Sequence, residues 1–293
     1  MHHARGGRLR PGHSRRRGQG GRRNKSRAMT TPVTATVTVV KLSDAISQHL
    51  TDTVVREFPL TIVLNDKELV TLLCSPQHLD YLAIGFLASE GLLNSKEDMK
   101  RLVVDEPAGV VEVEALSLAK QAGDVSRRII TSGCGRGVRL YSTGGLPPPV
   151  NSETRLSATE IFALMREFQQ RCTLFQATGG THAAALCSNS EILVFHEDIG
   201  RHNALDKVLG QCLLDGIATE DRLLLTSGRV SSEVVLKAAR RNIPLLVSKS
   251  APTDLAVKLA QDLSITLLGF VRGTRMNIYA NGWRITNDER QGK

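Results

Sequence analysis

The chain has 293 residues, which suits two modest domains or one large one, and its formal net charge is +9. Residues 1–28 hold ten Arg and Lys residues and no acidic residue, and subtracting those ten charges leaves −1 for residues 29–293. The body of the chain is therefore nearly neutral, and it contains no run of about 18 apolar residues, which excludes a membrane-spanning helix.

The basic N-terminal segment is rich in Gly and Arg and has too few apolar residues to fold alone. One interpretation is attraction to nucleic acid or to a membrane surface. The other is a disordered extension, or a translation start that really lies at Met29. We favour the second interpretation and expect no specific nucleic-acid partner. No apolar segment follows the arginines at 15–17, so export is not expected.

The first half of the body has the pattern of a small α+β domain. Residues 33–40 alternate with the period of a strand, and residues 59–64 and 68–73 predict a hairpin. Ser75 and Pro76 predict the start of a helix, because serine caps helices and proline suits the first helical position. Gly91 predicts its end. Further short strands are expected at 101–105, 109–115 and 127–131.

After the prolines at 147–149 the pattern changes. Ser157 and Glu160 form a capping box at the start of a helix that runs to about Cys172. The next strands are expected at 182–187 and 191–196, followed by helix 199–212, strand 222–226, helix 230–241, strand 244–248, helix 253–262 and strand 265–270. These strands are continuous apolar runs, which is typical of strands covered on both faces. We therefore expect an α/β fold in which helices flank a largely parallel sheet, with weaker strand candidates at 276–280 and 283–286.

The cysteines are five in number and widely spaced: Cys74, Cys134, Cys172, Cys187 and Cys212. This pattern contains no Cys-x-x-Cys pair and disfavours both a disulfide framework and a four-thiolate zinc site. Glycines flank Cys134, and Arg136 lies two residues further on. The pattern predicts a reachable thiol on a mobile loop, with a guanidinium that favours the reactive thiolate. The alternative is a glycine-rich turn that merely contains a small residue. The other cysteines are expected in the core or beside a helix end.

Three junctions that follow strands are rich in polar groups: residues 196–203, 226–233 and 270–275. In such sheets ligands bind at the carboxyl ends of strands, beside helix N-termini. The glycines and arginines of these junctions would suit a phosphorylated ligand. Helix capping or ion pairing explains each junction taken alone, but three junctions on one sheet edge favour a ligand site.

The sequence at these junctions resembles the FdhD family. The similar segments are residues 84–91 (IGFLASEG), 179–182 (GGTH), 196–207 (HEDIGRHNALDK), 226–229 (TSGR) and 248–253 (SKSAPT). The resemblance covers about residues 54–282. It implies a cytidine-deaminase-like fold, with a three-layer α/β/α domain preceded by a smaller α+β domain.

Members of this family are sulfur carriers that mature formate dehydrogenases. The resemblance implies that a cysteine desulfurase loads a persulfide onto a loop cysteine, and that this sulfur passes to molybdenum in the bis-molybdopterin guanine dinucleotide cofactor. Cys134 matches the first cysteine of the family's Cys-x-x-Cys loop, whereas Gly137 occupies the second position. One-cysteine carriage is therefore expected, and a two-thiol relay is in doubt. The family's Phe-x-Arg-x-x-Arg cofactor segment and two further candidates give the expected cofactor-binding residues: Phe270, Val271, Arg272, Gly273, Thr274 and Arg275, with Arg229 and His202.

Two functions from other classes compete with this prediction. A zinc deaminase needs His-x-Glu at one helix start and Pro-Cys-x-x-Cys at the next. Residues 201–203 and 226–232 supply no thiolate, and His202 alone cannot hold the ion, so no zinc is expected. The second competitor is a chaperone that binds the guanine dinucleotide without moving sulfur, and the missing second cysteine gives it weight.

The sequence thus predicts a cytoplasmic sulfurtransferase with Cys134 as its catalytic residue. The expected partners are a cysteine desulfurase and a formate dehydrogenase, and a cofactor with two guanine ends would suit a homodimer. The predicted organisation is a disordered basic tail at 1–28, a small α+β domain at 33–131, a mobile cysteine loop and linker at 132–150, and the cytidine-deaminase-like domain at 151–286.

Overall fold

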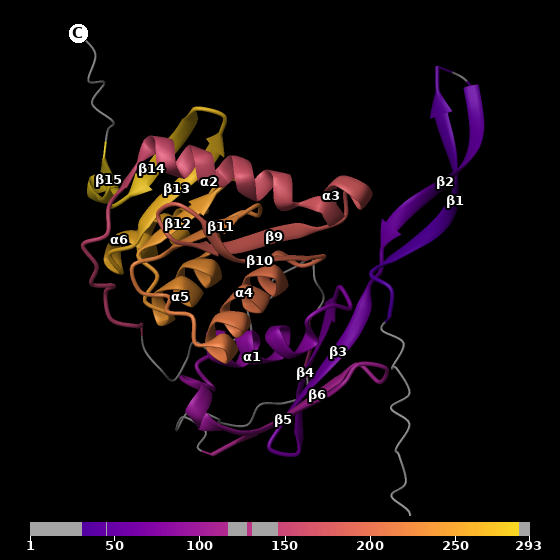
Figure 1. The fold of residues 1–293 in the computed structure, drawn as a ribbon, viewed down its shortest axis with the longest axis horizontal. Coiled ribbons are helices and arrows are strands. Elements are labelled where there is room, and N and C mark those ends of the chain that lie inside the picture. Colours follow the sequence, from indigo (N-terminus) through magenta and orange to yellow (C-terminus); the bar gives the residue numbers. More distant parts are fainter. Residues whose placement is uncertain (1–30, 45, 117–127, 131–145, 287–293) are drawn as a thin grey trace, which may run out of the picture.

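The structure, a computed structural model, describes residues 31–44, 46–116, 128–130 and 146–286 (Figure 1). The basic tail and residues 132–145 of the predicted cysteine loop, Cys134 among them, lie outside the described residues. Within them, no helix is long and apolar enough to cross a membrane.

A six-stranded sheet forms the centre of the second half of the chain, with the order β10-β9-β11-β12-β13-β14. Its strands are β9 (His182–Cys187), β10 (Ile192–Asp198), β11 (Leu223–Thr226), β12 (Leu245–Ser248), β13 (Thr266–Arg272) and β14 (Arg275–Ala280). Only the β11–β12 and β12–β13 pairings are parallel, and the other three are antiparallel. The prediction of a largely parallel sheet is therefore wrong, because apolar runs report burial on both faces and not strand direction.

Helices cover both faces of this sheet, which confirms the predicted three-layer α/β/α arrangement (Figure 1). One face packs against α2 (Ala158–Arg171), which begins at the predicted capping box and is followed by the short α3 (Thr173–Thr178). The other face packs against α4 (Arg201–Asp215), α5 (Ser232–Arg240) and α6 (Asp254–Asp262). Successive side chains of β11 point to opposite faces of the sheet. Leu223 and Leu225 pack on the α2 side, and Leu224 packs on the α4 side.

The first half of the body contains a five-stranded sheet with the order β5-β6-β3-β4-β7. Its strands are β3 (Phe58–Leu64), β4 (Lys67–Cys74), β5 (Met99–Asp105), β6 (Val110–Ala115) and β7 (Arg128–Ile130), with the 3-10 turn η1 (Lys96–Asp98) before β5. The antiparallel β3–β4 pairing confirms the predicted hairpin. The helix α1 (Leu79–Ser89) buries its apolar side chains against this sheet.

The predicted start of α1 is wrong. The helix begins at Leu79, after His78 in the left-handed conformation, rather than at Pro76. The Ser75 hydroxyl donates to an Asp198 carboxylate oxygen at 2.9 Å, so a distant residue uses the group that was expected to cap the helix. The predicted end is confirmed, because Gly91 follows the helix with a φ of 74°.

The helices α1 and α4 join the two sheets by crossing with their backbones in contact. A Cβ on Gly85 would lie 1.7 Å from the Asp206 carbonyl oxygen, and one on Gly210 would lie 1.9 Å from the Tyr81 carbonyl oxygen. Only glycine fits these two positions, and this close crossing explains why both sit inside helices that they would otherwise weaken.

The remaining strands form two small pairings. β1 (Thr34–Ser43) and β2 (Ile46–Val55) form a two-stranded antiparallel ribbon that projects from the body (Figure 1). The sequence predicts β1, whereas β2 was not anticipated. Near the C-terminus, the 3-10 turn η2 (Gly282–Arg284) leads into β15 (Ile285–Thr286), which pairs with β8 (Leu156–Ser157).

Candidate functional site

The strands β10, β11, β12 and β13 all end at one edge of the six-stranded sheet. β9 is antiparallel to both β10 and β11, so β10 runs in the same direction as β11, and β12 and β13 follow in parallel. The three polar junctions predicted from the sequence therefore share one edge, as expected.

Direct contacts connect these three junctions. A Cβ built on Gly228 would lie 3.0 Å from Cβ of Arg201, which joins the second junction to the first. The Ser248 hydroxyl donates to the Gly228 carbonyl oxygen at 2.7 Å. The Phe270 N–H donates to the Ser250 carbonyl oxygen at 3.1 Å, which joins the third junction through the segment after β12. The edge is therefore one continuous surface built from segments far apart in the sequence.

The turn between β13 and β14 presents the predicted cofactor segment. Arg272, Gly273, Thr274 and Arg275 are exposed, whereas Val271 is buried. Gly273 has a φ of 57°, and a Cβ there would meet no atom within 4 Å. The turn thus leaves room for a ligand to approach the backbone closely.

Phe270 holds an unusual backbone conformation at the base of this turn. Its φ is 52°, in the left-handed region that a bulky residue seldom adopts, and the register between β13 and β14 is broken here. Phe270 is 39% exposed, and the Arg272 guanidinium carbon lies 5.9 Å from the centre of its ring. The Arg272 Nε also donates to the Lys249 carbonyl oxygen at 3.2 Å. Ring and backbone together orient the Arg272 side chain.

His202, at the start of α4, lies in a group of buried polar atoms without partners. Both of its ring nitrogens, Nε of Arg201 and Oγ of Ser231 have no hydrogen-bond partner among the described residues. The Nε2 of His202 lies 3.4 Å from a Glu233 carboxylate oxygen. Burial, together with the positive charges of nearby Lys237 and Arg201, lowers the pKa of His202 to about 3. A neutral imidazole with unsatisfied nitrogens is ready to bond a polar ligand.

His182, the last residue of the 179–182 segment, lies at the same edge. Its Nδ1 lies 3.3 Å from the Ser227 hydroxyl oxygen, which also accepts from the Ala183 N–H at 2.9 Å. Burial lowers the pKa of His182, and the positive charge of Arg201 adds to this effect. Because β9 is antiparallel to β10 and β11, its first residue, His182, lies at the edge where those two strands end.

The predicted site residue Arg229 is exposed between β11 and α5. Ion pairing was the structural alternative for the edge arginines, with Glu197, Glu233 or Asp206 as partners. In the described part of the chain, none of these acids pairs with an arginine. Asp206 instead lies 2.6 Å from the Lys237 ammonium, and Glu197 accepts from the N–H groups of Leu174 and Phe175. The arginines of the edge therefore remain available to an anion.

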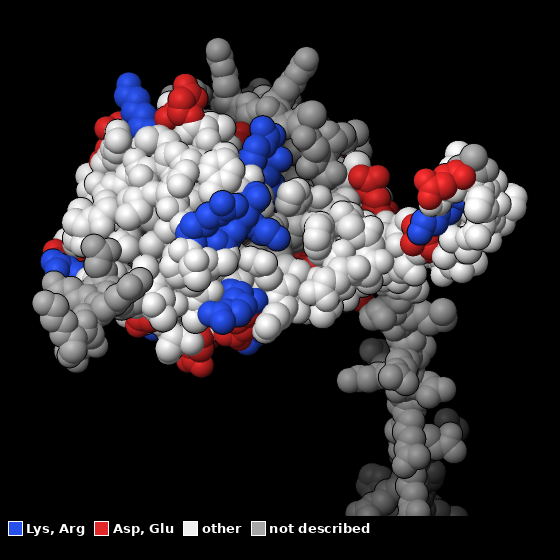
Figure 2. Space-filling view, turned by 90° about the horizontal axis from the view of Figure 1, so that it is seen from above, with Lys and Arg blue, Asp and Glu red and all other residues white. Residues whose placement is uncertain are grey.

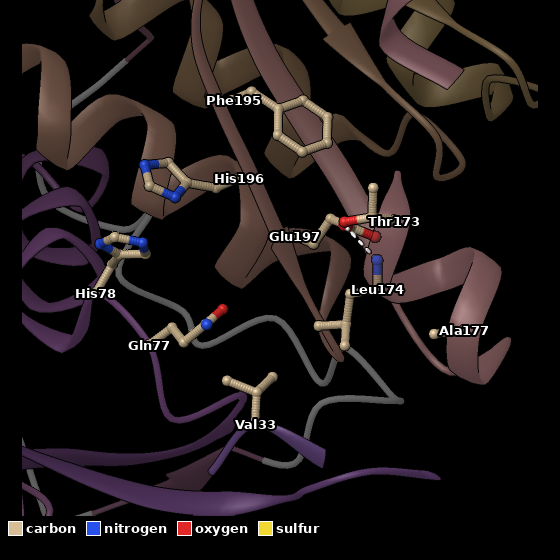
Figure 3. A pocket seen from close by; sticks show the side chains of 9 residues that line it. All are labelled: Val33, Gln77, His78, Thr173, Leu174, Ala177, Phe195, His196 and Glu197. Atoms are coloured by element: carbon tan, nitrogen blue, oxygen red, sulfur yellow. Dashed lines mark hydrogen bonds between the residues drawn. The ribbon is translucent and has the colours of Figure 1, made fainter. Parts of the chain in front are cut away.

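A cavity of about 370 Å³ opens beside the end of β10 (Figure 3). Its lining residues come from the start of the ribbon, the segment before α1, α3 and β10: Val33, Gln77, His78, Thr173, Leu174, Ala177, Phe195, His196 and Glu197. His78 and His196 meet edge to face, with ring centres 4.8 Å apart. The sequence analysis missed this cavity, and the only available signal was the histidine that opens the 196–203 segment.

Basic side chains gather across the middle of the face seen from above, and acidic side chains lie toward its rim (Figure 2). Within the described residues, no group of three or more His, Cys, Asp and Glu side chains is placed to hold a metal ion. The edge thus presents exposed arginines, whose guanidinium groups suit an anionic ligand.

The four cysteines in the described residues are all buried. Burial raises the pKa of Cys74, Cys187 and Cys212 to about 12, and that of Cys172 to about 11. Their thiolates are scarcely populated at neutral pH, so these side chains are poor nucleophiles.

Comparison with known proteins gives a consistent result over most of the chain. Residues 55–286 match the model of the FdhD/NarQ family. The chain is 46% identical over 239 residues to a sulfur carrier protein FdhD of Bacillus pumilus, covering 80% of this chain and 91% of the relative. It is 43% identical over 260 residues to the Bacillus subtilis protein of the same name, covering 88% and 99%.

A solved structure supports the same assignment. The crystal structure of a putative formate dehydrogenase accessory protein from Desulfotalea psychrophila superposes with a TM-score of 0.71 at 29% identity, covering 87% of this chain and all of that one. The resemblance seen in the sequence is thus confirmed, and the chain belongs to the FdhD/NarQ family.

Proposed function

We propose that this protein is a sulfur carrier in which Cys134 is the carrying residue. The observation that carries the proposal is the state of the other thiols: the four described cysteines are buried, and each has a raised pKa. Cys134, outside the described residues, is the one remaining cysteine of the five. Two relatives of this chain, from Bacillus pumilus and Bacillus subtilis, are named sulfur carrier proteins, which supports the same role for this protein.

The sulfur enters from the persulfide of a cysteine desulfurase. The Cys134 thiolate attacks the terminal sulfur of that persulfide, a new S–S bond forms on Cys134, and the desulfurase cysteine leaves as a thiolate. No external oxidant or reductant is needed, because one S–S bond replaces another. Since Gly137 stands in place of a second cysteine, no thiol at that position competes for the persulfide.

The sulfur acceptor is the molybdenum of a bound molybdopterin guanine dinucleotide, which is the substrate of the carrier. Arg272 and Arg275 contact its phosphates, and Gly273 admits them close to the backbone. His202 and Arg229 serve the same ligand, which the unsatisfied nitrogens of His202 and the exposure of Arg229 support. Phe270, Val271 and Thr274 complete the segment, and no zinc takes part.

The role requires a donor and a client. The donor is a cysteine desulfurase, and the client is a formate dehydrogenase, which the accessory-protein title of the Desulfotalea psychrophila relative supports. Both steps take place in the cytoplasm. A ligand with two guanine ends favours a carrier that works as a homodimer.

The test is to incubate the full chain with a cysteine desulfurase and cysteine and to record its intact mass. The expected result is a gain of one sulfur that a reductant removes and that is missing in Cys134→Ala. A matched control is Cys212→Ala, which should still gain the sulfur because Cys212 is buried.

Two outcomes would overturn the proposal. Labelling of Cys134→Ala would assign the sulfur to another cysteine. An unmodified mass, under conditions that load a control acceptor, would favour a chaperone that binds the guanine dinucleotide and moves no sulfur.

A further inference from the structure

The proposed ligand ends in guanine, and guanine differs from adenine in the hydrogen bonds that its base edge offers. Guanine presents an N1–H and a 2-amino group, and both are donors. A site that selects guanine needs acceptors opposite them, and an ionised carboxylate offers acceptors only. Such a site also rejects an analogue that lacks the donor. The acidic residues of the ligand edge are therefore the side chains to compare.

Three acidic residues lie in the junctions that form this edge: Glu197, Asp198 and Glu233. Two of them already have partners. The Glu197 carboxylate accepts from two backbone N–H groups of α3 and from a threonine hydroxyl. The Asp198 carboxylate is fully buried and lies 2.6 Å from the Lys207 ammonium. Glu233 is the acidic residue of the junctions that remains for a ligand.

Glu233 lies in the first turn of α5, and in the described part of the chain no lysine or arginine forms an ion pair with it. Its side chain is 25% exposed, and the Nε2 of His202 lies 3.4 Å from one carboxylate oxygen. Since the pKa of His202 is lowered to about 3, this imidazole is neutral near pH 7. Lys237, one turn further along α5, lies 2.6 Å from both carboxylate oxygens of Asp206 instead. The Glu233 carboxylate thus keeps its capacity to accept hydrogen bonds.

Glu233 and the phosphate-binding turn lie on one surface at a distance that suits a nucleotide. The end of β11 leads to Glu233 and the end of β13 leads to Arg272, with β12 between them. Neighbouring strands are about 4.8 Å apart, so these two strand ends are separated by about 10 Å. The segment after β12 contacts both sides, since Ala251 accepts from the Val230 N–H at 3.1 Å and the preceding residue accepts from the Phe270 N–H. The ribose of one nucleotide can bridge this separation.

We propose that Glu233 selects guanine in the ligand of this edge. Its carboxylate accepts from the N1–H and the 2-amino group of the base, while Arg272 and Arg275 hold the phosphates. Adenine has an acceptor at N1 and no amino group at C2, so it would face the carboxylate without a donor. The inference rests on the ligand of the proposed function and adds the residue that decides its base.

Isothermal titration calorimetry of the full chain with nucleoside diphosphates tests the proposal. The wild type is expected to bind GDP about tenfold or more tightly than inosine diphosphate, which lacks only the 2-amino group, and to bind ADP most weakly. Glu233→Ala removes both acceptors, so it should bind GDP and inosine diphosphate equally.

Glu233→Gln gives a reversal that a folding defect cannot produce. Xanthosine diphosphate has a carbonyl oxygen where guanine has its 2-amino group, and a glutamine amide can donate to that oxygen. This variant should bind xanthosine diphosphate more tightly than GDP, whereas the wild type should show the opposite order. The matched control is Asp254→Asn, which removes an exposed carboxylate from the first turn of α6. It reproduces the loss of a favourable charge at a helix N-terminus and should keep the wild-type order.

Two results would overturn the proposal: a wild type that binds GDP and inosine diphosphate equally, or a Glu233→Gln protein that still prefers GDP to xanthosine diphosphate. Neither result concerns the loading of sulfur on Cys134, so failure of base selection is distinguishable from failure of the proposed function. A wild type that binds no nucleotide would overturn the proposed ligand and this inference with it.

Discussion

The Lys207 ammonium lies 2.6 Å from a carboxylate oxygen of Asp198, and neither side chain reaches solvent. The Asp198 carboxylate also accepts from the N–H and hydroxyl of Ser75, the N–H of Gly200 and the Asn203 amide, at 2.9 to 3.0 Å. This carboxylate thus fixes the end of β10, the start of α4 and the segment before α1 around one buried charge.

Removing the ammonium should therefore be costly. Lys207→Met leaves Asp198 as an uncompensated buried charge, and we expect the free energy of unfolding to fall by about 3–5 kcal/mol. Urea titration followed by circular dichroism measures this change. The matched control is Lys258→Met at an exposed position of α6, which should change stability by no more than about 0.5 kcal/mol. Equal stability of the two variants would contradict a structural role for the pair.

His196 should make the protein less stable in acid. It is 6% exposed, and burial lowers its pKa from 6.5 to about 4. Between those values the unfolded chain binds a proton that the native protein does not, so the free energy of unfolding falls as the pH falls from 6.5 to 4. In His196→Gln the free energy of unfolding should therefore fall by about 1–3 kcal/mol less than in the wild type over this pH range.

The measurement is urea unfolding at several pH values between 7.5 and 4.5. The quantity compared is the slope of the free energy of unfolding against pH, not the stability at a single pH. This comparison matters because the variant also loses the hydrogen bond from His196 Nε2 to Gln211. The control is Gln48→Ala on the exposed ribbon, which removes no titratable group and should keep the wild-type dependence of stability on pH. An unchanged slope in His196→Gln would show that His196 does not titrate as expected.

The crossing of α1 and α4 should tolerate no side chain larger than glycine. In Gly85→Ala the new Cβ would lie 1.7 Å from the Asp206 carbonyl oxygen, so the helices must move apart. We expect a loss of roughly 3 kcal/mol or more, measured as a lower thermal midpoint. Gln261→Ala, at an exposed position of α6, is the control and should change little. A Gly85→Ala protein as stable as the wild type would mean that the helices are further apart than described.

The arginines of the β13–β14 turn should bind phosphate groups. GDP resembles one end of the proposed ligand, and charge-assisted contacts contribute about 1.5–3 kcal/mol, so Arg272→Ala and Arg275→Ala should each weaken GDP binding about tenfold or more. Isothermal titration calorimetry measures the affinity. Arg101→Ala, exposed on β5, is the control and should bind GDP normally. If both variants bind GDP as tightly as the wild type, Arg272 and Arg275 do not bind its phosphates.

Local sequence signals predict the three-layer domain well, because its strands are apolar runs and its helices carry capping signals. The box at Ser157 and Glu160 is an example, with both reciprocal bonds present. The strand β2 is not predicted in this way, because most of its residues are exposed and its sequence shows no alternation of apolar and polar residues. The helix α3 escapes it because it has only six residues, and a distant carboxylate, Glu197, binds the N–H groups of its first turn.

The site is only partly readable from the sequence for a similar reason. Arginines and glycines after apolar strands predict the edge, because the end of a strand is a local feature. The cavity beside β10 needs His78 and His196, which are far apart in the sequence and meet only through the fold. The start of α1 was misplaced because Ser75 bonds Asp198, a contact between residues 123 positions apart.

The glycine-lined crossing also determines how the chain could be divided. Two buried carboxylates of the second half each take a hydroxyl from the first half, since Ser75 donates to Asp198 and Ser89 donates to Asp206 at 2.6 Å. A fragment of residues 151–286 alone would lack both donors and would expose the face of α4 that α1 covers. The first half therefore supplies hydrogen-bond donors and packing contacts that buried groups of the second half require. Two separately produced pieces are expected to restore the fold by complementation when mixed, although neither is expected to fold alone.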